Sequence, residues 1–340
     1  MVINVNPKPL VEIFTDFVRN SKVMFNFKTD GKTLHIQVLS DYTVTTSIPV
    51  DSVDGDYHET DISVWVTKCI HILNDDEYIH MTINDAALVI EQSKFNCVML
   101  REYESRRELP SLDNIELKPA FANRLKYLAH ASVSCMSMAR ELSIADPDPV
   151  FANGKFYMHY NQAAFIDSIN YPQMSIPFST LRDFAYKLNA EAQYAYLTDI
   201  DTLYIKSDKY EFWVPTSNYN INNNIISTLD KKLAGCVEVT TLSIKSYRDK
   251  FSIIADSFPK QKLAVSIGEH QISIAASANN YNVGVGDKVV KQLVTFMVTS
   301  AQLSTICKLF DDDEISIRKG VGCICLTSGE KTLMIAGVAY

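Results

Sequence analysis

The chain has 340 residues, a formal net charge of −8 at neutral pH, 47% hydrophobic residues and 21% charged residues. This balance is ordinary for a water-soluble globular protein, and the length suits two or three domains. No stretch reaches the ~20 apolar residues of a membrane-spanning helix, and the first residues lack the pattern of a signal peptide, so we expect neither membrane insertion nor secretion.

The first predicted repeat, residues 1–110, opens with a helix whose apolar stripe runs from Leu10 to Val18. Apolar side chains in residues 62–73 fall at i, i+3, i+4, i+7, i+8 and i+11, which predicts a second helix. The acidic turn 74–77 ends it, because these residue types favour turns over helix interiors. Alternation and turn residues predict strands at 23–27, 34–39, 79–83, 88–90 and 97–100.

The second predicted repeat, residues 111–220, opens with a helix through Phe121, Leu125 and Leu128. A second helix is predicted from Phe178 to Leu188. The polar, asparagine-rich segment 215–235 is predicted to be a solvated connector to the next repeat. Strands are predicted at 134–142, 155–160, 194–197, 203–205 and 211–214.

The third predicted repeat, residues 221–340, has helices at 244–254 and 303–310, and its acidic run 311–314 repeats the turn at 74–77. Equivalent residues at the ends of the three second helices, Leu73, Leu188 and Phe310, are spaced 115 and 122 residues apart. Three such units fill the chain, so we predict an α+β fold of three repeated domains, each with two helices and antiparallel sheet. Further strands are predicted at 263–267, 271–275, 315–317, 323–326 and 333–335.

The seven cysteines are expected to be reduced. Cys323 and Cys325 are separated by one residue, which differs from the two- to four-residue gap of zinc sites. We therefore expect no metal ion and no other cofactor, in a reducing, cytoplasmic compartment. The cysteines within predicted helices and strands are expected to pack as small apolar side chains. They are Cys69, Cys97, Cys135, Cys307 and Cys323.

Basic residues recur on the polar faces of the predicted helices, whereas no acidic residue lies between Lys118 and Arg140. If all six helices lie on one side of the sheets, that side is cationic although the chain is acidic overall. Such a surface suits sequence-independent contact with phosphates. A solvated helix surface is the alternative for each residue taken singly. The residues expected to contact DNA are Lys8, Arg19, Lys22, Lys68, Lys118, Arg124, Lys126, Arg182, Lys187, Lys245, Arg248, Lys250 and Lys308.

Three units of two helices and antiparallel strands, acidic overall with basic helix faces, resemble the DNA sliding clamps, and most closely the bacterial β clamps. The resemblance covers nearly the whole chain but is one of architecture. Where bacterial clamps carry Ala-Thr-Asp-Gly-His-Arg-Leu, this chain has Tyr160–Ile166, and their Met-Pro-Met-Arg-Leu end is here Ala336–Tyr340. A divergent clamp from a phage or another mobile element fits this loss of motifs.

The resemblance implies that each chain forms half of a closed ring, a homodimer that encircles double-stranded DNA. Such a ring is opened by a clamp loader and tethers a DNA polymerase through a short peptide that docks in an apolar pocket. The pocket is expected between the second and third domains, with core packing as the alternative for each residue. By position it includes Phe165, Ile166, Ile176, Leu242, Met334, Ala336 and Val338.

An enzyme is the main competing class of function. Gly284-Val285-Gly286 lacks the third glycine and the helix of a dinucleotide-binding loop. Gly329–Thr332 resembles the end of a phosphate-binding loop without its first glycine, and no nucleophile has a neighbouring base. We therefore expect a protein that is not an enzyme. A clamp-like scaffold that binds DNA as a monomer, without closing a ring, is a third possibility.

Overall fold

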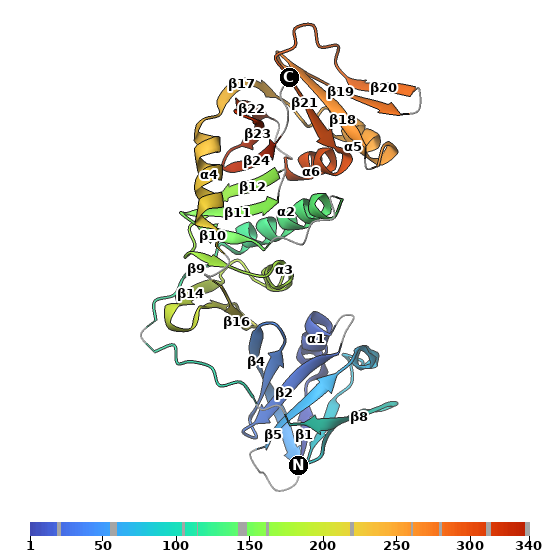
Figure 1. Cartoon of the computed structure of the whole chain (residues 1–340). Coiled ribbons are helices and arrows are strands. Elements are labelled where there is room, and N and C mark those ends of the chain that lie inside the picture. The colour runs from blue at the N-terminus through green and yellow to red at the C-terminus, as the bar shows by residue number, and fades with distance from the viewer. Residues whose placement is uncertain are drawn as a thin grey trace. The chain divides into compact units, whose positions relative to one another are not determined.

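The computed structural model describes residues 1–18, 22–54, 60–103, 106–113, 115–141, 148–160, 163–217, 221–259, 261–278, 281–310 and 314–336. The fold is α+β, as expected, and every strand pair in these residues is antiparallel (Figure 1). None of the described helices is long and apolar enough to cross a membrane. The helices are α1 Pro7–Phe17, α2 Ala122–Glu141, α3 Phe178–Ala185, α4 Asn223–Ala234, α5 Arg248–Ser257 and α6 Ser300–Leu309, with 3₁₀-helices η1 Lys68–Ile72 and η2 Thr198–Ile200.

The chain divides into two compact units. The first contains residues 1–123 and 183–215, and the second contains residues 124–182 and 216–340. Both units combine segments of neighbouring predicted repeats, because sheets continue from one repeat into the next. The domain boundaries 1–110, 111–220 and 221–340 stay a prediction.

The first unit is built on one twelve-stranded sheet in the order β1-β6-β7-β8-β5-β2-β3-β4-β16-β15-β14-β9. Its two parts meet where Val44 of β4 pairs with Phe212 of β16. Helix α1 packs its buried Phe14 against the rings of Phe25 and Phe27 on β2. The strands are β1 Val2–Val5, β2 Val23–Thr29, β3 Thr33–Leu39, β4 Thr43–Asp54, β5 Thr60–Val66, β6 Ile79–Ile83, β7 Ala87–Gln92, β8 Phe95–Glu102, β9 Lys118–Pro119, β14 Gln193–Leu197, β15 Thr202–Lys206 and β16 Glu211–Pro215.

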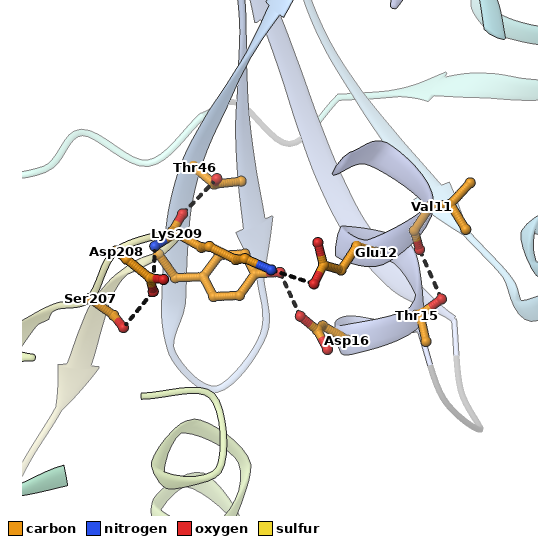
Figure 2. A network of polar contacts seen from close by, with 9 residues as sticks. Val11, Glu12, Thr15, Asp16, Thr46, Ser207, Asp208 and Lys209 are labelled. Carbon is orange, nitrogen blue, oxygen red and sulfur yellow. Dashed lines mark hydrogen bonds and ion pairs between the residues drawn. The ribbon is translucent and has the colours of Figure 1, made fainter. Parts of the chain in front are cut away.

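A polar network reinforces this junction between the two parts of the first unit (Figure 2). In the turn between β15 and β16, Lys209 forms an ion pair with Glu12 of α1. The neighbouring Tyr210 hydroxyl donates to Asp16 Oδ2 at 2.6 Å. Thr46 of β4 donates to the Lys209 carbonyl oxygen at 2.8 Å. The acidic residues of α1 therefore hold the β15–β16 turn against the helix.

The second unit contains an eight-stranded sheet, β13-β10-β11-β12-β24-β23-β22-β17, and a four-stranded sheet, β20-β19-β18-β21. The larger sheet joins two predicted repeats where Ala164 of β12 pairs with Met334 of β24. The strands are β10 Val150–Ala152, β11 Lys155–Tyr160, β12 Ala163–Ser168, β13 Met174–Ser175, β17 Val237–Leu242, β18 Lys262–Gly268, β19 Gln271–Ala278, β20 Tyr281–Gly286, β21 Val294–Thr299, β22 Ile315–Gly320, β23 Cys323–Ser328 and β24 Lys331–Ala336.

Helices α4 and α2 flank the larger sheet (Figure 1). On β12, Ala164 and Ile166 pack in the cluster that includes residues of α4. Phe165, between them, lies against Tyr127 of α2 with ring centroids 6.3 Å apart. Because successive side chains of a strand point to opposite faces, α4 covers one face of this sheet and α2 covers the other.

Three sequence predictions of secondary structure are wrong. Residues 62–66 form strand β5, in which Ile62, Val64 and Val66 are all buried and alternate with Ser63 and Trp65. The spacing of Ile62 and Val66 fits a helix and a strand equally. Residues 134–141 continue helix α2, where Ser132, Cys135 and Met136 are buried at helical spacing. The expected connector 215–235 contains helix α4.

Helix α4, which the sequence did not predict, lies on the face of the larger sheet opposite to α2. That the six predicted helices share one side of the sheets stays a prediction. The remaining predicted helices and strands are present, with limits that differ by a few residues from those expected. The acidic run 311–313 lies outside the described residues.

The wholly buried carboxyl group of Asp167 on β12 forms an ion pair with Arg124 of α2. Asp167 Oδ2 has no hydrogen-bond partner among the described residues. Burial raises the pKa of Asp167 to about 6, against the opposing effect of the Arg124 guanidinium. The native state therefore keeps a proton on this carboxyl group over a pH range in which the unfolded chain has released it.

We predict that Asp167→Asn changes how stability depends on pH. In the unfolded chain this carboxyl group has a pKa near 3.8. Its contribution to the stability of the wild type is therefore fully present below about pH 4 and is lost as pH rises to about 6. The free energy of unfolding of the wild type, relative to that of the variant, should fall by something on the order of 2–3 kcal/mol across this window. Urea denaturation between pH 4 and 7 measures it.

Glu330→Gln is the matched control, because Glu330 also contacts Arg124, at 3.2 Å, but is two-thirds exposed. It should leave the pH dependence between 4 and 6 nearly unchanged. A difference between the wild type and Asp167→Asn that stays constant with pH would contradict the prediction.

Candidate functional site

A pocket of about 330 Å³ lies between α4 and the larger sheet of the second unit. Helix α4 contributes Ile225, Thr228 and Leu229 to one wall. The opposite wall comes from neighbouring strands, where the small side chain of Ala164 faces α4 and leaves the hollow. Ala163 also borders the pocket. The remaining lining residues are His159, Asn222, Asn224, Lys232, Cys323, Met334 and Ala336.

The local sequence explains why the asparagine-rich segment forms α4. The Asn222 side chain accepts hydrogen bonds from the backbone N–H groups of Asn224 and Ile225, at 3.1 and 3.2 Å, which caps the helix. Ile225, Ile226 and Leu229 then follow at helical spacing and pack toward the sheet. The asparagines therefore begin the helix rather than form a connector.

Asp230 fixes α4 to strand β11. Its carboxyl group accepts a hydrogen bond from Lys155 Nζ at 2.7 Å and another from the Tyr157 hydroxyl, whose oxygen is 3.0 Å from both carboxyl oxygens. Burial, reinforced by Asp230, raises the pKa of Tyr157, so its hydroxyl keeps the proton that it donates. The distance between α4 and the sheet, and with it the width of the pocket, depends on this contact.

The lining of the pocket is mainly apolar. Burial lowers the pKa of His159, which makes its imidazole neutral at physiological pH. Lys232, which is exposed, supplies positive charge to the lining. Such a surface suits a ligand with apolar side chains and a negative charge near one end.

The residues predicted for a peptide pocket lie in different places. Met334 and Ala336 line the pocket, whereas Val338 lies outside the described residues. Phe165 faces the α2 side of the sheet. The side chains of Phe165, Ile166, Ile176 and Leu242 are packed in the core, with relative exposures of 0–2%.

Sequence reasoning missed the α4 wall of the pocket and the two alanines opposite it. The helical spacing of Ile225, Ile226, Leu229 and Leu233 was the signal that could have found the wall. The positions of Ala163 and Ala164 follow only from the pairing of β11, β12 and β24.

The residues expected to contact DNA differ in exposure, and Arg19 lies outside the described residues. Arg124, Lys126, Lys187 and Arg248 are partly buried. Arg124 contacts two carboxyl groups, and Arg248 Nε donates to the Cys307 carbonyl oxygen at 2.9 Å. Exposed side chains belong to Lys8, Lys22, Lys68, Lys118, Arg182, Lys245, Lys250 and Lys308.

Charge on the helices is more mixed than the sequence suggested. Helix α1 carries Lys8 together with the two acidic residues of the polar network in Figure 2. On α5, Lys250 lies between the exposed Asp249 and Asp256. Helix α2 has no acidic residue from Ala122 to Met136, but its Arg124 is engaged by two carboxyl groups and its Lys126 is partly buried. Roles in DNA contact remain predictions for all of these residues.

No family model and no curated protein matches the sequence. Solved structures do match over nearly the whole length. The β clamp of Helicobacter pylori bound to a DNA ligase peptide has 12% identity and a TM-score of 0.76, with 100% of both chains covered. The chain has the β-clamp fold.

Two further solved structures support this assignment of the fold. The β subunit of DNA polymerase from Streptococcus pyogenes has 14% identity and a TM-score of 0.75, with 100% of both chains covered. The DNA polymerase III subunit β of Pseudomonas aeruginosa has 9% identity and a TM-score of 0.76, with 99% of both chains covered. The resemblance to sliding clamps is thereby confirmed at the level of the fold.

We predict that Asp230→Ala loosens α4. Loss of the hydrogen bonds to Lys155 and Tyr157 should lower the free energy of unfolding by about 1 kcal/mol, since the pair is partly solvated. Amide hydrogen exchange in α4 should accelerate relative to exchange in β11. Ser227→Ala, an exposed change on the same helix, should leave both unchanged. Unaltered exchange in the Asp230 variant would show that another contact fixes the helix.

Proposed function

We propose that the protein is a DNA sliding clamp, in which two chains close a ring around duplex DNA and tether a DNA polymerase. The full-length β-clamp fold, at TM-scores of 0.75–0.76 with 99–100% coverage of both chains, carries this proposal. A closed ring holds DNA by topology, so it requires no tight or sequence-specific site. Binding alone performs this task, which makes the proposed function non-enzymatic.

Sequence-independent contact is expected to come from lysine and arginine side chains that reach the phosphates directly or through water. The exposed lysines of α1, η1 and α6, together with Lys126 of α2, are the proposed contacts. Such contacts carry no base information, and a ring held by them can slide. The net charge of −8 does not oppose this function, because the distribution of charge determines local attraction.

Ring closure would pair a free sheet edge of the first repeat with one of the third repeat in the partner. Along β8, residues 95–100 pair with β7 on one side, and only residues 101–102 pair with β5 on the other. Val98 and Leu100 on this strand are 60% and 72% exposed. In the third repeat, β20 is an edge strand of the four-stranded sheet as described. Two-fold pairing of these edges would cover both.

We predict that the protein in solution has twice the 38.3 kDa mass of one chain. Leu100→Glu should halve that mass, because it places a charge in the proposed contact between edges. Val321→Glu, at a residue that is 94% exposed in a turn, is the control and should leave the mass unchanged. Size-exclusion chromatography with light scattering measures it. A wild-type mass of 38.3 kDa would contradict ring closure and favour a monomeric scaffold.

We also propose that the pocket beside α4 binds the peptide of a polymerase or another DNA-processing partner. The support is its apolar lining, the exposed Lys232, and its formation by segments of the second and third predicted repeats. The H. pylori β clamp binds a DNA ligase peptide. The same class of ligand suits the pocket of this chain.

We predict that the H. pylori DNA ligase peptide, labelled with a fluorophore, binds the wild type, and that Ile225→Lys weakens binding at least tenfold. The new charge would enter an apolar wall, and a tenfold change corresponds to about 1.4 kcal/mol. Ser227→Lys adds the same charge to the same helix outside the lining and should have little effect. Fluorescence anisotropy measures both. Equal affinities of the two variants would reject this pocket.

We predict that alanine at Lys8, Lys68, Lys126 and Lys308 together weakens binding to duplex DNA at low salt. Removal of one lysine–phosphate contact should make the slope of log K against log salt concentration roughly 0.9 less negative. The matched control replaces four lysines outside the proposed surface, namely the exposed Lys94, Lys288, Lys291 and Lys319. An identical change of slope in the two quadruple variants would count against the assigned surface.

A further inference from the structure

Three buried cysteines meet beside the pocket of the second unit. Cys236 follows α4, and Cys323 and Cys325 lie on the same face of β23. The Sγ atom of Cys236 is 3.9 Å from that of Cys323 and 3.4 Å from that of Cys325. All three Sγ atoms lie within 4.8 Å of one another. The fold thus joins residues that are 87 and 89 positions apart in sequence.

A glycine provides the space for this cluster. Gly320 pairs with Cys323 across the hairpin of β22 and β23. A Cβ atom on Gly320 would lie 2.6 Å from Cys236 Sγ and 3.0 Å from Cys323 Sγ, closer than the sulfur atoms allow. The backbone angle φ of Gly320 is not among the positive values. Space for the sulfurs, rather than an unusual turn, therefore accounts for glycine at this position.

The separations match those of thiolates around one metal ion. A zinc–sulfur bond of about 2.3 Å and tetrahedral angles place neighbouring sulfur atoms roughly 3.8 Å apart. We propose that Cys236, Cys323 and Cys325 bind one thiolate-seeking metal ion of the zinc class. Three thiols would each release a proton and form one sulfur–metal bond. The site differs from the sequence expectation of no metal, because one of its three ligands is distant in the chain.

The surroundings of the cluster supply access and charge. Cys323 lines the pocket, which gives an ion a path from solvent. Among the described residues, no fourth side chain of His, Cys, Asp or Glu joins the cluster, so a fourth ligand would come from water or from a small molecule in the pocket. Lys232, in the lining of the same pocket, offsets the excess negative charge of three thiolates around a divalent ion. The Cys236 thiol hydrogen bond to the Lys232 carbonyl oxygen, at 3.1 Å, would be given up.

A bound ion would join the end of α4 to β23, and both elements border the pocket. Metal binding would therefore stabilise the α4 wall. This consequence rests on the proposed function of the pocket, whereas binding of the ion itself does not.

The test is a Co²⁺ titration of the full-length protein. The protein is first reduced and then freed of metal with a chelator. We expect a thiolate-to-cobalt charge-transfer band that saturates at one equivalent per chain and disappears when Zn²⁺ is added. Saturation should be accompanied by protection of three thiols from alkylation. Absence of the band in the folded wild type would overturn the proposal, as would the isolation of a disulfide among these cysteines from protein kept under reducing conditions.

Variants locate the site. Cys236→Ala and Cys325→Ala should each lose the band, whereas Cys135→Ala and Cys307→Ala, also buried, should keep it. Gly320→Ala should weaken Co²⁺ binding by at least tenfold through displacement of two sulfurs. Circular dichroism confirms folding in each case, and a band that survives in a folded Cys236 variant would contradict the assignment. If the cobalt charge-transfer band is present but the peptide does not bind, the proposed peptide pocket is rejected and the metal site is not.

Discussion

The alternation of side chains in the larger sheet of the second unit is the constraint on which the proposed site depends. On β12, Ala164 and Ile166 face α4, whereas Phe165 and Asp167 face α2. A shift of one residue in the pairing with β24 would exchange these faces. It would place Arg124 against apolar side chains and turn Phe165 and Asp167 toward the α4 side. The pairing of Ala164 with Met334 therefore determines which side chains of β12 face α4 and which face α2.

The proposed function assigns two kinds of recognition to the two faces of this sheet. The α4 face has small side chains and an apolar hollow, which suit a short peptide. The α2 face carries Lys126, a proposed DNA contact, and α2 packs against α6, since the Tyr127 hydroxyl donates to the Leu309 carbonyl oxygen at 3.3 Å. A clamp that holds DNA on one face and a partner on the other needs such a division, because one ligand then leaves the other face free.

Much of the fold could be predicted from sequence because its signals are local. Alternating strands such as Ile79–Ile83 and the helix from Ser300 to Leu309 are present as expected. The predictions of secondary structure failed where the spacing of apolar residues fits both a helix and a strand, as for Ile62 and Val66. They also failed where a segment rich in polar residues contains an apolar stripe, as in α4. Intrinsic preferences are weak there, and tertiary packing decides the conformation.

The candidate site was less predictable because it depends on contacts between distant segments. Met334 and Ala336 were anticipated from the resemblance, but the wall made by Ile225 was not. No local pattern places Cys236 beside Cys325. Charges were misjudged for the same reason: Arg124 has the expected position on a helix, but the buried carboxyl group of Asp167 on β12 engages it.

Photo-crosslinking to DNA tests the proposed division of faces most directly. A photoreactive residue is placed either at Lys126 on α2 or at Thr228 on α4, and each protein is irradiated with duplex DNA at low salt. DNA should be captured from position 126 and not from position 228, where a labelled partner peptide should be captured instead. Equal capture of DNA from the two positions, or capture from position 228 alone, would contradict the account.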